Sequence, residues 1–499
     1  MTTFFSFFTK HPVPKKETLK GLLARPLSWH GVVLYALLGA IAVVAYLCIL
    51  SINRQFLVKV PAYGGSITEG VIGAPHTINP VIATTTTDVS LTKLIFSGLM
   101  REDVDGTLVP DLATSYEISS DGRVYTFILP QKLKWSDNKP LTSADIAFTI
   151  SKRALYDSTW QNISVSTPDP QTVIITLPEA REGFLAHTTL GIIPQHIWND
   201  STDEDFDTRA ANLHPVGSGP YAYVSLRTSD GVPEELVLKR NRHYAHRAVY
   251  LDRYKIAFFA NQQTLLAALA RGSIDLTLAA DAQTASAVDQ ETYSIEPVAT
   301  PLMVGLFHSG SDPSSLGTRS IADALNRIVD KAGILAIVEH GYGILPDSAP
   351  ALSREEALSL LGTLGYTSPN GVLEKNGNPL GFSIAVENDP TLLSTARTLA
   401  DELGKLGIIV TIKAFDHGAF EDGIARTEYA VVLGAFAPQS IPRGYQPVLP
   451  LYTKARTLIR TYDLHLTLPP TLGSPEDRYA ASADWHTQTD NIWKFFSNN

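Results

Sequence analysis

The feature that most constrains this chain is an uninterrupted apolar run near its N-terminus, from Val32 to Leu50. The run holds about nineteen residues without a charge, and a helix of that length, at about 1.5 Å per residue, matches a hydrocarbon core of roughly 30 Å. A core helix of a soluble protein is rarely apolar on every face. The run therefore predicts one N-terminal transmembrane helix over residues 31–52, preceded by a basic segment, 1–30, and followed by a linker, 53–65.

The charges that flank the run predict its orientation. One acid, Glu17, precedes it, together with a set of basic residues: Lys10, Lys15, Lys16, Lys20 and Arg25. Because basic segments stay on the cytosolic side of a membrane, we expect a single-pass protein with a cytosolic N-terminus and an extracytoplasmic body, in the periplasm or at the cell exterior. A cleaved signal peptide remains an alternative, although its apolar region usually spans only about 7 to 15 residues.

The charge of the rest of the chain limits its partners. The whole chain has a net charge of −10, and residues 1–60 hold seven bases and one acid, which leaves the remainder at −16. A body this acidic is poorly suited to binding nucleic acid or anionic lipid. Its only cysteine, Cys48, lies in the apolar run, so the body has neither an intrachain disulfide nor a cysteine metal site.

The body alternates strand and helix patterns, which predicts an α/β fold. Runs of β-branched and aromatic residues predict strands at 124–129, 172–177, 235–239 and 254–259. Thr142 and Asp145 form a capping pattern before a helix over 143–156. Asp389 and Pro390 begin a second helix, which lies between strand patterns at 382–386 and 408–412 and predicts a parallel strand-helix-strand unit.

Motifs for catalysis, metals and nucleotides are missing. The sequence around Ser218 is glycine-rich but lacks the spacing of a nucleophile elbow, and we interpret it as a tight turn. His243 and His246 are flanked by arginines, which would repel a metal ion. No phosphate-binding glycine motif occurs. We therefore expect no enzyme activity, no catalytic residues, no metal and no cofactor.

Several short motifs occur in a fixed order along the body. The densest is the block from Leu133 to Asp145, and the others are Thr77–Pro80, Phe96–Leu99, Pro110–Ala113, Ser120–Phe127, Pro215–Tyr221, Leu238–Asn241, Gly272–Asp275 and Ile321–Asp330. In this combination the chain resembles the family 5 extracellular solute-binding proteins, the oligopeptide- and dipeptide-binding class of ABC transporters. The resemblance extends over residues 66 to about 436.

The resemblance implies a two-lobed fold of the periplasmic-binding-protein type II class, which carries an extra domain. It places lobe I at 66–98, 215–300 and 440–499, the extra domain at 99–214 and lobe II at 301–439. It implies a membrane-anchored binding protein, with a monomeric body, that captures a peptide or similar solute by lobe closure and delivers it to ABC permease subunits. The alternatives are a non-transport sensor or interaction module, and a binder of carbohydrate or cell-wall fragments.

The resemblance also indicates ligand-binding residues. In the peptide-binding members an aspartate pairs with the peptide ammonium, and Gln439 stands at the matching position of this chain, with Phe436 in place of the preceding tryptophan. Glutamine cannot neutralise a buried ammonium. We therefore expect Phe436, Gln439, Thr84, Thr85 and Thr86 to line the cleft with an aromatic wall and neutral hydrogen-bonding groups, unless the threonines only edge a loop. Four aromatic residues near the C-terminus suggest a terminal amphipathic helix: Trp485, Trp493, Phe495 and Phe496.

Overall fold

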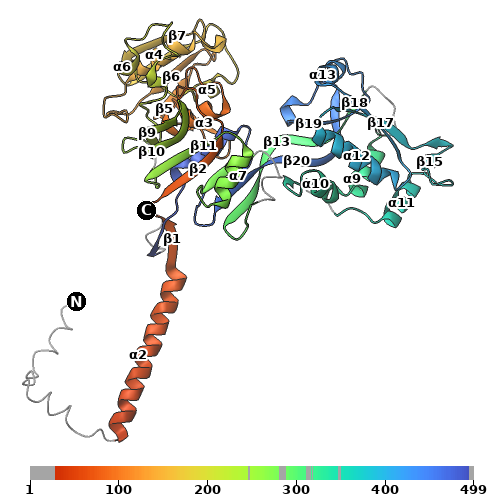
Figure 1. Ribbon diagram of the computed structural model, residues 1–499, viewed down its shortest axis with the longest axis horizontal. Coiled ribbons are helices and arrows are strands. Elements are labelled where there is room, and N and C mark those ends of the chain that lie inside the picture. The colour runs from red at the N-terminus through yellow and green to blue at the C-terminus, as the bar shows by residue number, and fades with distance from the viewer. Residues whose placement is uncertain are drawn as a thin grey trace, which may run out of the picture. The chain divides into compact units, whose positions relative to one another are not determined.

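The computed structural model describes residues 29–245, 248–279, 288–310, 316, 318–346 and 350–493. The chain divides into two compact units, which we call the terminal unit, residues 1–60 with 489–499, and the body, residues 61–488 (Figure 1).

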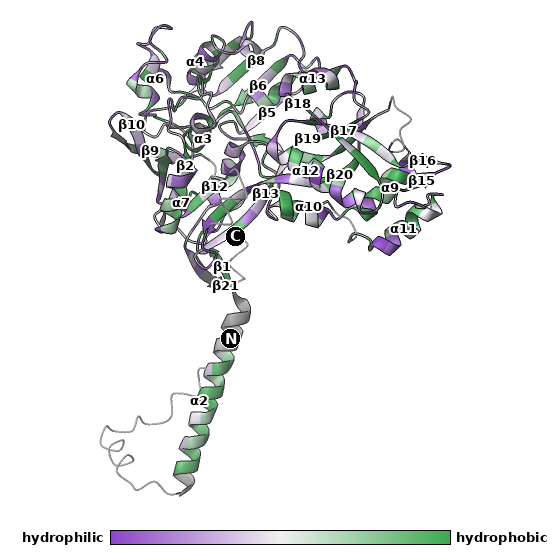
Figure 2. Ribbon diagram, turned by 45° about the vertical axis from the view of Figure 1, so that its right-hand side comes forward, coloured by the Kyte–Doolittle hydropathy of each residue, from purple (hydrophilic) through white to green (hydrophobic). Residues whose placement is uncertain are grey.

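The terminal unit consists of one long helix and a small sheet. Helix α2 (Trp29–Phe56) extends past both ends of the predicted 31–52 segment, and Figure 2 shows hydrophobic residues along it. Within the residues that the structure describes, no helix is both long enough and apolar enough to cross a membrane. The predicted linker, 53–65, contains the end of α2 and strand β1 (Leu57–Pro61), which pairs with β21 (Thr489–Trp493). The predicted terminal amphipathic helix is therefore wrong at Trp493, while Phe495 and Phe496 lie outside the described residues.

Lobe I of the body is built on a mixed sheet in which β11, β2 and β12 run parallel. Along this half of the sheet the strands are β9 (Tyr221–Ser229), β10 (Val232–Arg240), β11 (Arg253–Phe259), β2 (Ser66–Ile72), β12 (Leu276–Ala279) and the second part of β20 (Tyr445–Thr461). The covering elements are α3 (Thr86–Ile95), α7 (Gln262–Ala270), and the short helices η2 (Ala210–Asn212) and η5 (Pro475–Asp484).

The extra domain has its own sheet, with strand order β5-β6-β8-β7, and its own apolar core. Trp135 is fully buried in that core, as expected of a packing residue. Helix α4 begins at Ser143 behind the predicted Thr142–Asp145 capping box, but it ends at Arg153. The elements are β3 (Met100–Glu102), β4 (Leu108–Pro110), β5 (Ser115–Ile118), β6 (Val124–Ile128), α4 (Ser143–Arg153), η1 (Ser158–Trp160), β7 (Ser164–Asp169), β8 (Thr172–Thr176), α5 (Phe184–His187) and α6 (Gln195–Trp198).

Lobe II contains the predicted strand-helix-strand unit. Strands β17 and β18 pair in parallel, and α12, capped by Asp389 with Pro390 in its first turn, connects them. The leucines of α12 pack into the core of lobe II. The elements are α9 (Arg319–Ile328), α10 (Lys331–Val338), β14 (Gly343–Ile344), α11 (Arg354–Thr363), β15 (Glu374–Lys375), β16 (Asn378–Pro379), β17 (Gly381–Glu387), α12 (Pro390–Gly404), β18 (Ile409–Phe415), α13 (His417–Ala425), β19 (Val431–Phe436) and η4 (Pro438–Ser440).

Two long strands belong to both lobes. Strand β13 (Tyr293–Ser309) pairs with β20 over nearly their whole lengths, so that one continuous sheet includes strands of both lobes (Figure 1). The pairing is interrupted between Ala299 and Met303, where three residues of β13 stand opposite Lys454 alone. The first part of β13 therefore belongs with lobe I and the rest with lobe II. The first part of β20 also packs in the lobe II core, through Leu449, Leu451 and Tyr452, although the resemblance placed residues 440–499 in lobe I.

Gly217 and Gly219 are required by close packing. Neither has a positive φ angle, but a Cβ atom at either position would overlap the backbone at Ile95, the last residue of α3. The backbone N–H of Gly219 donates to the Ile95 carbonyl at 2.8 Å. This contact fixes the start of β9 against α3.

We predict that Gly217→Ala lowers the free energy of unfolding by about 1–3 kcal/mol, because the added methyl group must push two backbone segments apart. Chemical denaturation measures the loss. The control is Gly362→Ala in α11, where an added Cβ meets open space and stability should stay level or rise by up to about 1 kcal/mol. Equal effects of the two substitutions would contradict the packing argument.

Candidate functional site

Thr84 and Thr85 end the exposed loop that leads into α3, and Thr86, also exposed, is the first residue of the helix. The Thr85 hydroxyl caps this helix by accepting the backbone N–H of Asp88 at 3.1 Å. Asn79 fixes the residues before the loop. Its side chain donates to the Asn212 side chain at 2.9 Å and accepts the backbone N–H of Val81 at 3.0 Å. Thr85 thus has a structural role, while all three threonines remain accessible to a solute.

Phe436 and Gln439 lie in lobe II, at the end of β19 and in η4. The Phe436 ring is half-buried and makes an edge contact with Phe307, with ring centroids 5.0 Å apart. It occupies the space that a side chain at position 434 would need, which explains the glycine there. Gln439 is exposed. None of the five predicted residues lines any of the three pockets described below. None of these pockets therefore brings the threonines together with Phe436 and Gln439.

A pocket of about 250 Å³ lies beside the threonine loop, and we call it the Arg153 pocket. Pro80 and Ala83, just before the threonines, line it together with residues of the extra domain. Arg153 donates to the backbone carbonyl of Val81 at 2.7 Å and pairs with Asp157 at 2.9 Å. The arginine therefore fastens the loop to the extra domain.

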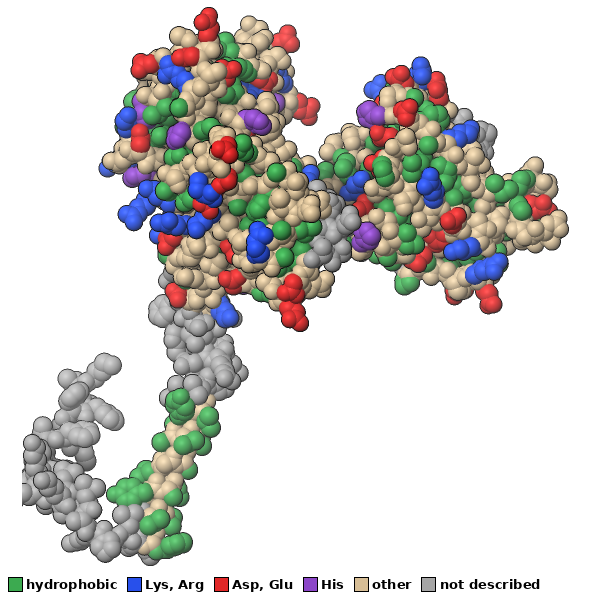
Figure 3. All heavy atoms as spheres, viewed as in Figure 1, with side chains coloured by type: hydrophobic (Ala, Val, Ile, Leu, Met, Phe, Trp, Pro, Cys, Tyr) green, Lys and Arg blue, Asp and Glu red, His purple; other side chains and the backbone are tan. Residues whose placement is uncertain are grey.

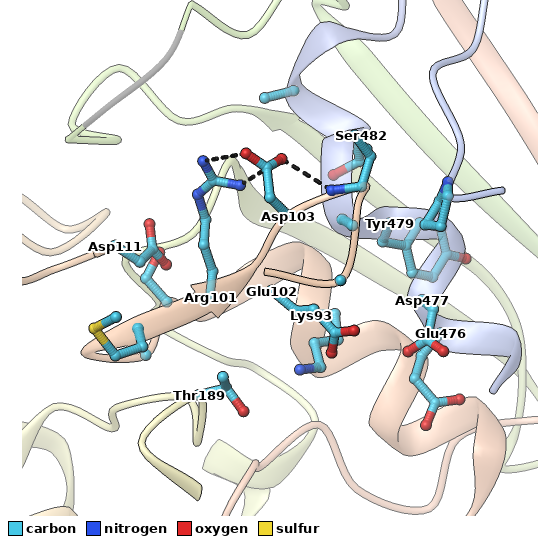
Figure 4. A pocket seen from close by; sticks show the side chains of 18 of the residues that line it. Lys93, Arg101, Glu102, Asp103, Asp111, Thr189, Glu476, Asp477, Tyr479 and Ser482 are labelled. Atoms are coloured by element: carbon cyan, nitrogen blue, oxygen red, sulfur yellow. Dashed lines mark hydrogen bonds and ion pairs between the residues drawn. The ribbon is translucent and has the colours of Figure 1, made fainter. Parts of the chain in front are cut away.

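A larger pocket of about 350 Å³ lies between α3, the start of the extra domain and η5, and we call it the η5 pocket (Figure 4). It shares Lys93, Phe96 and Thr189 with the Arg153 pocket. Its charged lining is mostly acidic: Glu102, Asp103, Asp105, Asp111, Glu476 and Asp477, against Lys93 and Arg101.

The charges of the η5 pocket affect one another. Arg101 pairs with Asp103 at 3.2 Å. Partial burial raises the pKa of Glu102, the nearby Asp477 raises it further, and Lys93 opposes both. Sequence reasoning missed this pocket because most of its lining comes from two segments, 93–111 and 469–483. Those segments are far apart in the chain and carry no shared motif.

A third pocket, of about 390 Å³, belongs to lobe II. It lies over β17, β18 and the start of β19, and is lined by Phe382, Ser383, Lys413, Glu428 and Tyr429, among others.

A buried ion pair stabilises the side of the η5 pocket that η5 forms. Glu69 of β2 is fully buried and Arg478 of η5 is 4% exposed. Arg478 Nε donates to Glu69 Oε1 at 2.9 Å, and the hydroxyls of Tyr254 and Tyr479 both donate to Oε2 at 2.6 Å. Burial alone would lower the pKa of Arg478, but Glu69 and the two tyrosines reverse the effect and raise it. Because Tyr479 also lines the pocket, this network fixes η5 to the lobe I sheet.

The sequence of the chain matches a known family. The family model for bacterial extracellular solute-binding proteins, family 5, matches residues 107–457, which is more than half of the chain. The chain belongs to this family. The solute-binding protein is also similar in sequence to several other proteins. It is 26% identical over 381 residues to protein XP55 of Streptomyces lividans, covering 70% of this chain and 66% of that one.

Two other relatives carry ligand names. The oligopeptide-binding protein AppA of Bacillus subtilis is 23% identical over 392 residues, covering 72% of this chain and 70% of that one. The probable D,D-dipeptide-binding periplasmic protein DdpA of Escherichia coli is 22% identical over 386 residues, covering 74% of each chain. Both of these relatives are named as binding proteins.

Solved structures confirm the fold of this solute-binding protein. A nickel ABC transporter protein of Bacillus halodurans aligns with a TM-score of 0.67 at 16% identity, over 84% of this chain and 99% of that one. The periplasmic murein tripeptide-binding protein MppA, in an unliganded open form, aligns with a TM-score of 0.65 at 17% identity, over 86% and 98%. The expected binding-protein fold with mixed α and β structure is therefore confirmed.

We predict that Glu69→Gln destabilises this solute-binding protein by about 3–5 kcal/mol, because it leaves the Arg478 guanidinium buried without a counter-charge. Denaturant unfolding followed by tryptophan fluorescence measures the change. The control is Glu234→Gln, which breaks the exposed pair with Arg227 and should cost no more than about 1 kcal/mol. A loss for Glu69→Gln as small as that of the control would refute the proposed role.

Proposed function

We propose that the protein captures a peptide or similar solute outside the cytosol by closure of its two lobes, and delivers it to the permease of an ABC importer. The observation that carries this proposal is the interruption in the pairing of β13 with β20. A break in a ladder bends and loosens a strand locally, and Pro301 within it has no backbone N–H to pair. The two lobes, each with its own core, can then rotate about one short segment.

The interruption has a defined local structure. The Thr300 hydroxyl donates to the Lys454 carbonyl at 2.8 Å, in place of a regular ladder bond. On the lobe II side, β14 pairs with Lys454 and Thr453. The interruption at residues 300–302 leaves three residues of β13 opposite one of β20, while the two further register shifts, after Val304 and after Leu306, each leave one extra residue in β20. A solute between the lobes would favour the closed state through contacts that exist only there.

We propose the five predicted residues as the solute contacts. Thr84, Thr85 and Thr86 would supply hydroxyls from lobe I, and Phe436 and Gln439 an aromatic wall and an amide from lobe II. The exposure of the three threonines and Gln439, and the partial exposure of Phe436, support this assignment. Two relatives are named for binding oligopeptides and, probably, a D,D-dipeptide. With neutral groups here, the solute is a peptide held mainly by its backbone amides, or a carbohydrate or cell-wall fragment.

We predict that a short peptide and its N-acetylated form bind with similar affinity in titration calorimetry. Gln439 offers a hydrogen bond but no charge to an ammonium, so the free amine gains little. Gln439→Asp should create a preference for the free amine of about tenfold, worth roughly 1.4 kcal/mol.

The matched control places the same substitution at another exposed glutamine of lobe II, Gln446→Asp, and should leave the ratio of affinities unchanged. A strong preference of the unmodified protein for the free amine would show that a counter-charge exists elsewhere, and would overturn the role of Gln439.

We further propose that α2 remains uncleaved and tethers the protein to the membrane. The proposal is supported by the continuous helix over Trp29–Phe56, by the uncharged run from Val32 to Leu50 and by the bases that precede it. A tether would raise the effective concentration of the binding protein at a permease.

We predict that the full chain stays with membranes during alkaline carbonate extraction. The double substitution Leu38→Arg with Ile41→Arg should release it, because each charge near the centre of a bilayer costs about 2.5–3.5 kcal/mol. The control, Leu38→Ala with Ile41→Ala, should stay bound. Accumulation outside the cell of a soluble fragment without residues 1–60 would contradict the tether.

A further inference from the structure

Three strands of lobe I have one of their termini at the edge of the sheet where the chain enters the body. Strands β11 and β2 start side by side, with Arg253 paired with Ser66, and β10 runs the opposite way and ends there, with Lys239 paired with Arg253. The backbone N–H of Asp252 donates to the Gly65 carbonyl at 3.1 Å. This edge of the sheet therefore adjoins the residues that follow β1.

Basic side chains gather at this edge. We define the basic rim as Lys239, Arg240, Arg242 and Arg253, and Figure 3 shows Lys and Arg side chains over the part of lobe I that Figure 1 labels β9 and β10. Arg240 pairs with Asp252 at 2.9 Å. The other three are exposed and form no ion pair among the described residues. The rim is thus a local basic surface on a body of net negative charge.

The pairing of Lys239 with Arg253 costs stability. The two residues are direct partners in antiparallel strands, so their side chains project from the same face of the sheet. Like charges in such positions repel each other and destabilise the sheet. Their neighbours on that face do not relieve the repulsion, because Lys239 also stands opposite Ala222 of β9, and Arg253 opposite Ser66 of β2. An anion bound from outside would relieve it.

An exposed tyrosine joins the rim. Tyr63 is 59% exposed, and the Arg240 guanidinium lies 5.0 Å from the centre of its ring. Its other neighbour is Tyr250, with ring centroids 5.2 Å apart. Tyrosine is enriched where proteins meet the headgroup region of a membrane. Along the chain, Tyr63 lies only seven positions after Phe56, the last residue of α2.

We propose that the basic rim, with Tyr63, docks on anionic phospholipid headgroups of the membrane to which α2 is tethered. The inference rests on the proposed tether, which would keep this edge of lobe I near the bilayer. Each basic residue near an anionic surface strengthens association by roughly fivefold. The net negative charge of the body does not prevent this, since salt screens charges more than about 10 Å away.

The test measures the acylation rate of Lys239 by mass spectrometry under single-hit conditions. The full chain is placed in vesicles of phosphatidylcholine alone, or of phosphatidylcholine with phosphatidylglycerol. We expect the Lys239 rate to fall about fivefold or more in the anionic vesicles only, and to recover at high salt. Lys413, an exposed lysine on β18 of lobe II, should react equally in both. Equal Lys239 rates in the two vesicle types would overturn the proposal.

Two substitutions separate docking from a structural role. Arg253→Gln should weaken the protection of Lys239 in anionic vesicles, since one of the four bases is lost, while the melting temperature in lipid-free detergent stays level or rises, because cross-strand repulsion is removed. Arg271→Gln, at an exposed arginine after α7 in the same lobe, should preserve the protection. Full protection in the Arg253→Gln variant would refute the role of the rim.

The same samples distinguish the rim from the tether. If carbonate extraction releases the chain but Lys239 is still protected on anionic vesicles, the tether is wrong and the rim is right. If the chain is retained but Lys239 is unprotected, the rim is wrong. Protection in native membranes, but not in anionic vesicles that contain no other protein, would assign this surface to a protein partner and overturn lipid docking.

Discussion

The antiparallel pairing of β13 with β20 is the constraint on which the rest of the body depends. These strands supply backbone hydrogen bonds to β12 in lobe I and to β19 in lobe II, so each lobe completes its sheet on the same pair. Shifting their register would displace both cores together. The interruption at residues 300–302 is the widest of the three register shifts in the pair, and it lies where the proposed closure of the lobes requires the sheet to bend.

Lobe I buries a pair of opposite charges beside η5, and burying charges costs free energy. The Glu69–Arg478 pair is buried, and the hydroxyls of Tyr254 and Tyr479 donate hydrogen bonds to the carboxylate. These contacts leave the two charged groups few other arrangements. A buried pair of this kind is a weak source of net stability. It does fix one arrangement, because a displaced η5 would leave both charges unpaired. The wall of the η5 pocket is thereby held in place.

Sequence reasoning succeeded where the signal is local. The capping box at Thr142, the Asp389–Pro390 helix start and the strand at 254–259 all depend on neighbouring residues, and the structure confirms them. Reasoning failed where distant segments decide. The C-terminal strand was predicted as a helix because its aromatic spacing suits one, but pairing with β1 overrides that preference.

The net charge could not predict the basic rim, for a related reason. The total of −16 describes the body on average, whereas strand pairing brings Lys239 and Arg253 together from separate segments. The η5 pocket and the Glu69–Arg478 pair were also beyond prediction, since the paired residues lie 409 positions apart. The solute contacts proposed at Thr84, Thr85, Thr86, Phe436 and Gln439 come from the resemblance, and they remain predictions.

The pairing of β1 with β21 has a consequence for the order of folding. Strand β1 leaves the ribosome before the body, but its partner, Thr489–Trp493, is made only after the whole of the body. Contacts between segments so far apart carry the largest loop-closure cost and form late. The small sheet next to α2 therefore closes last, and its formation marks a chain whose synthesis has passed β21.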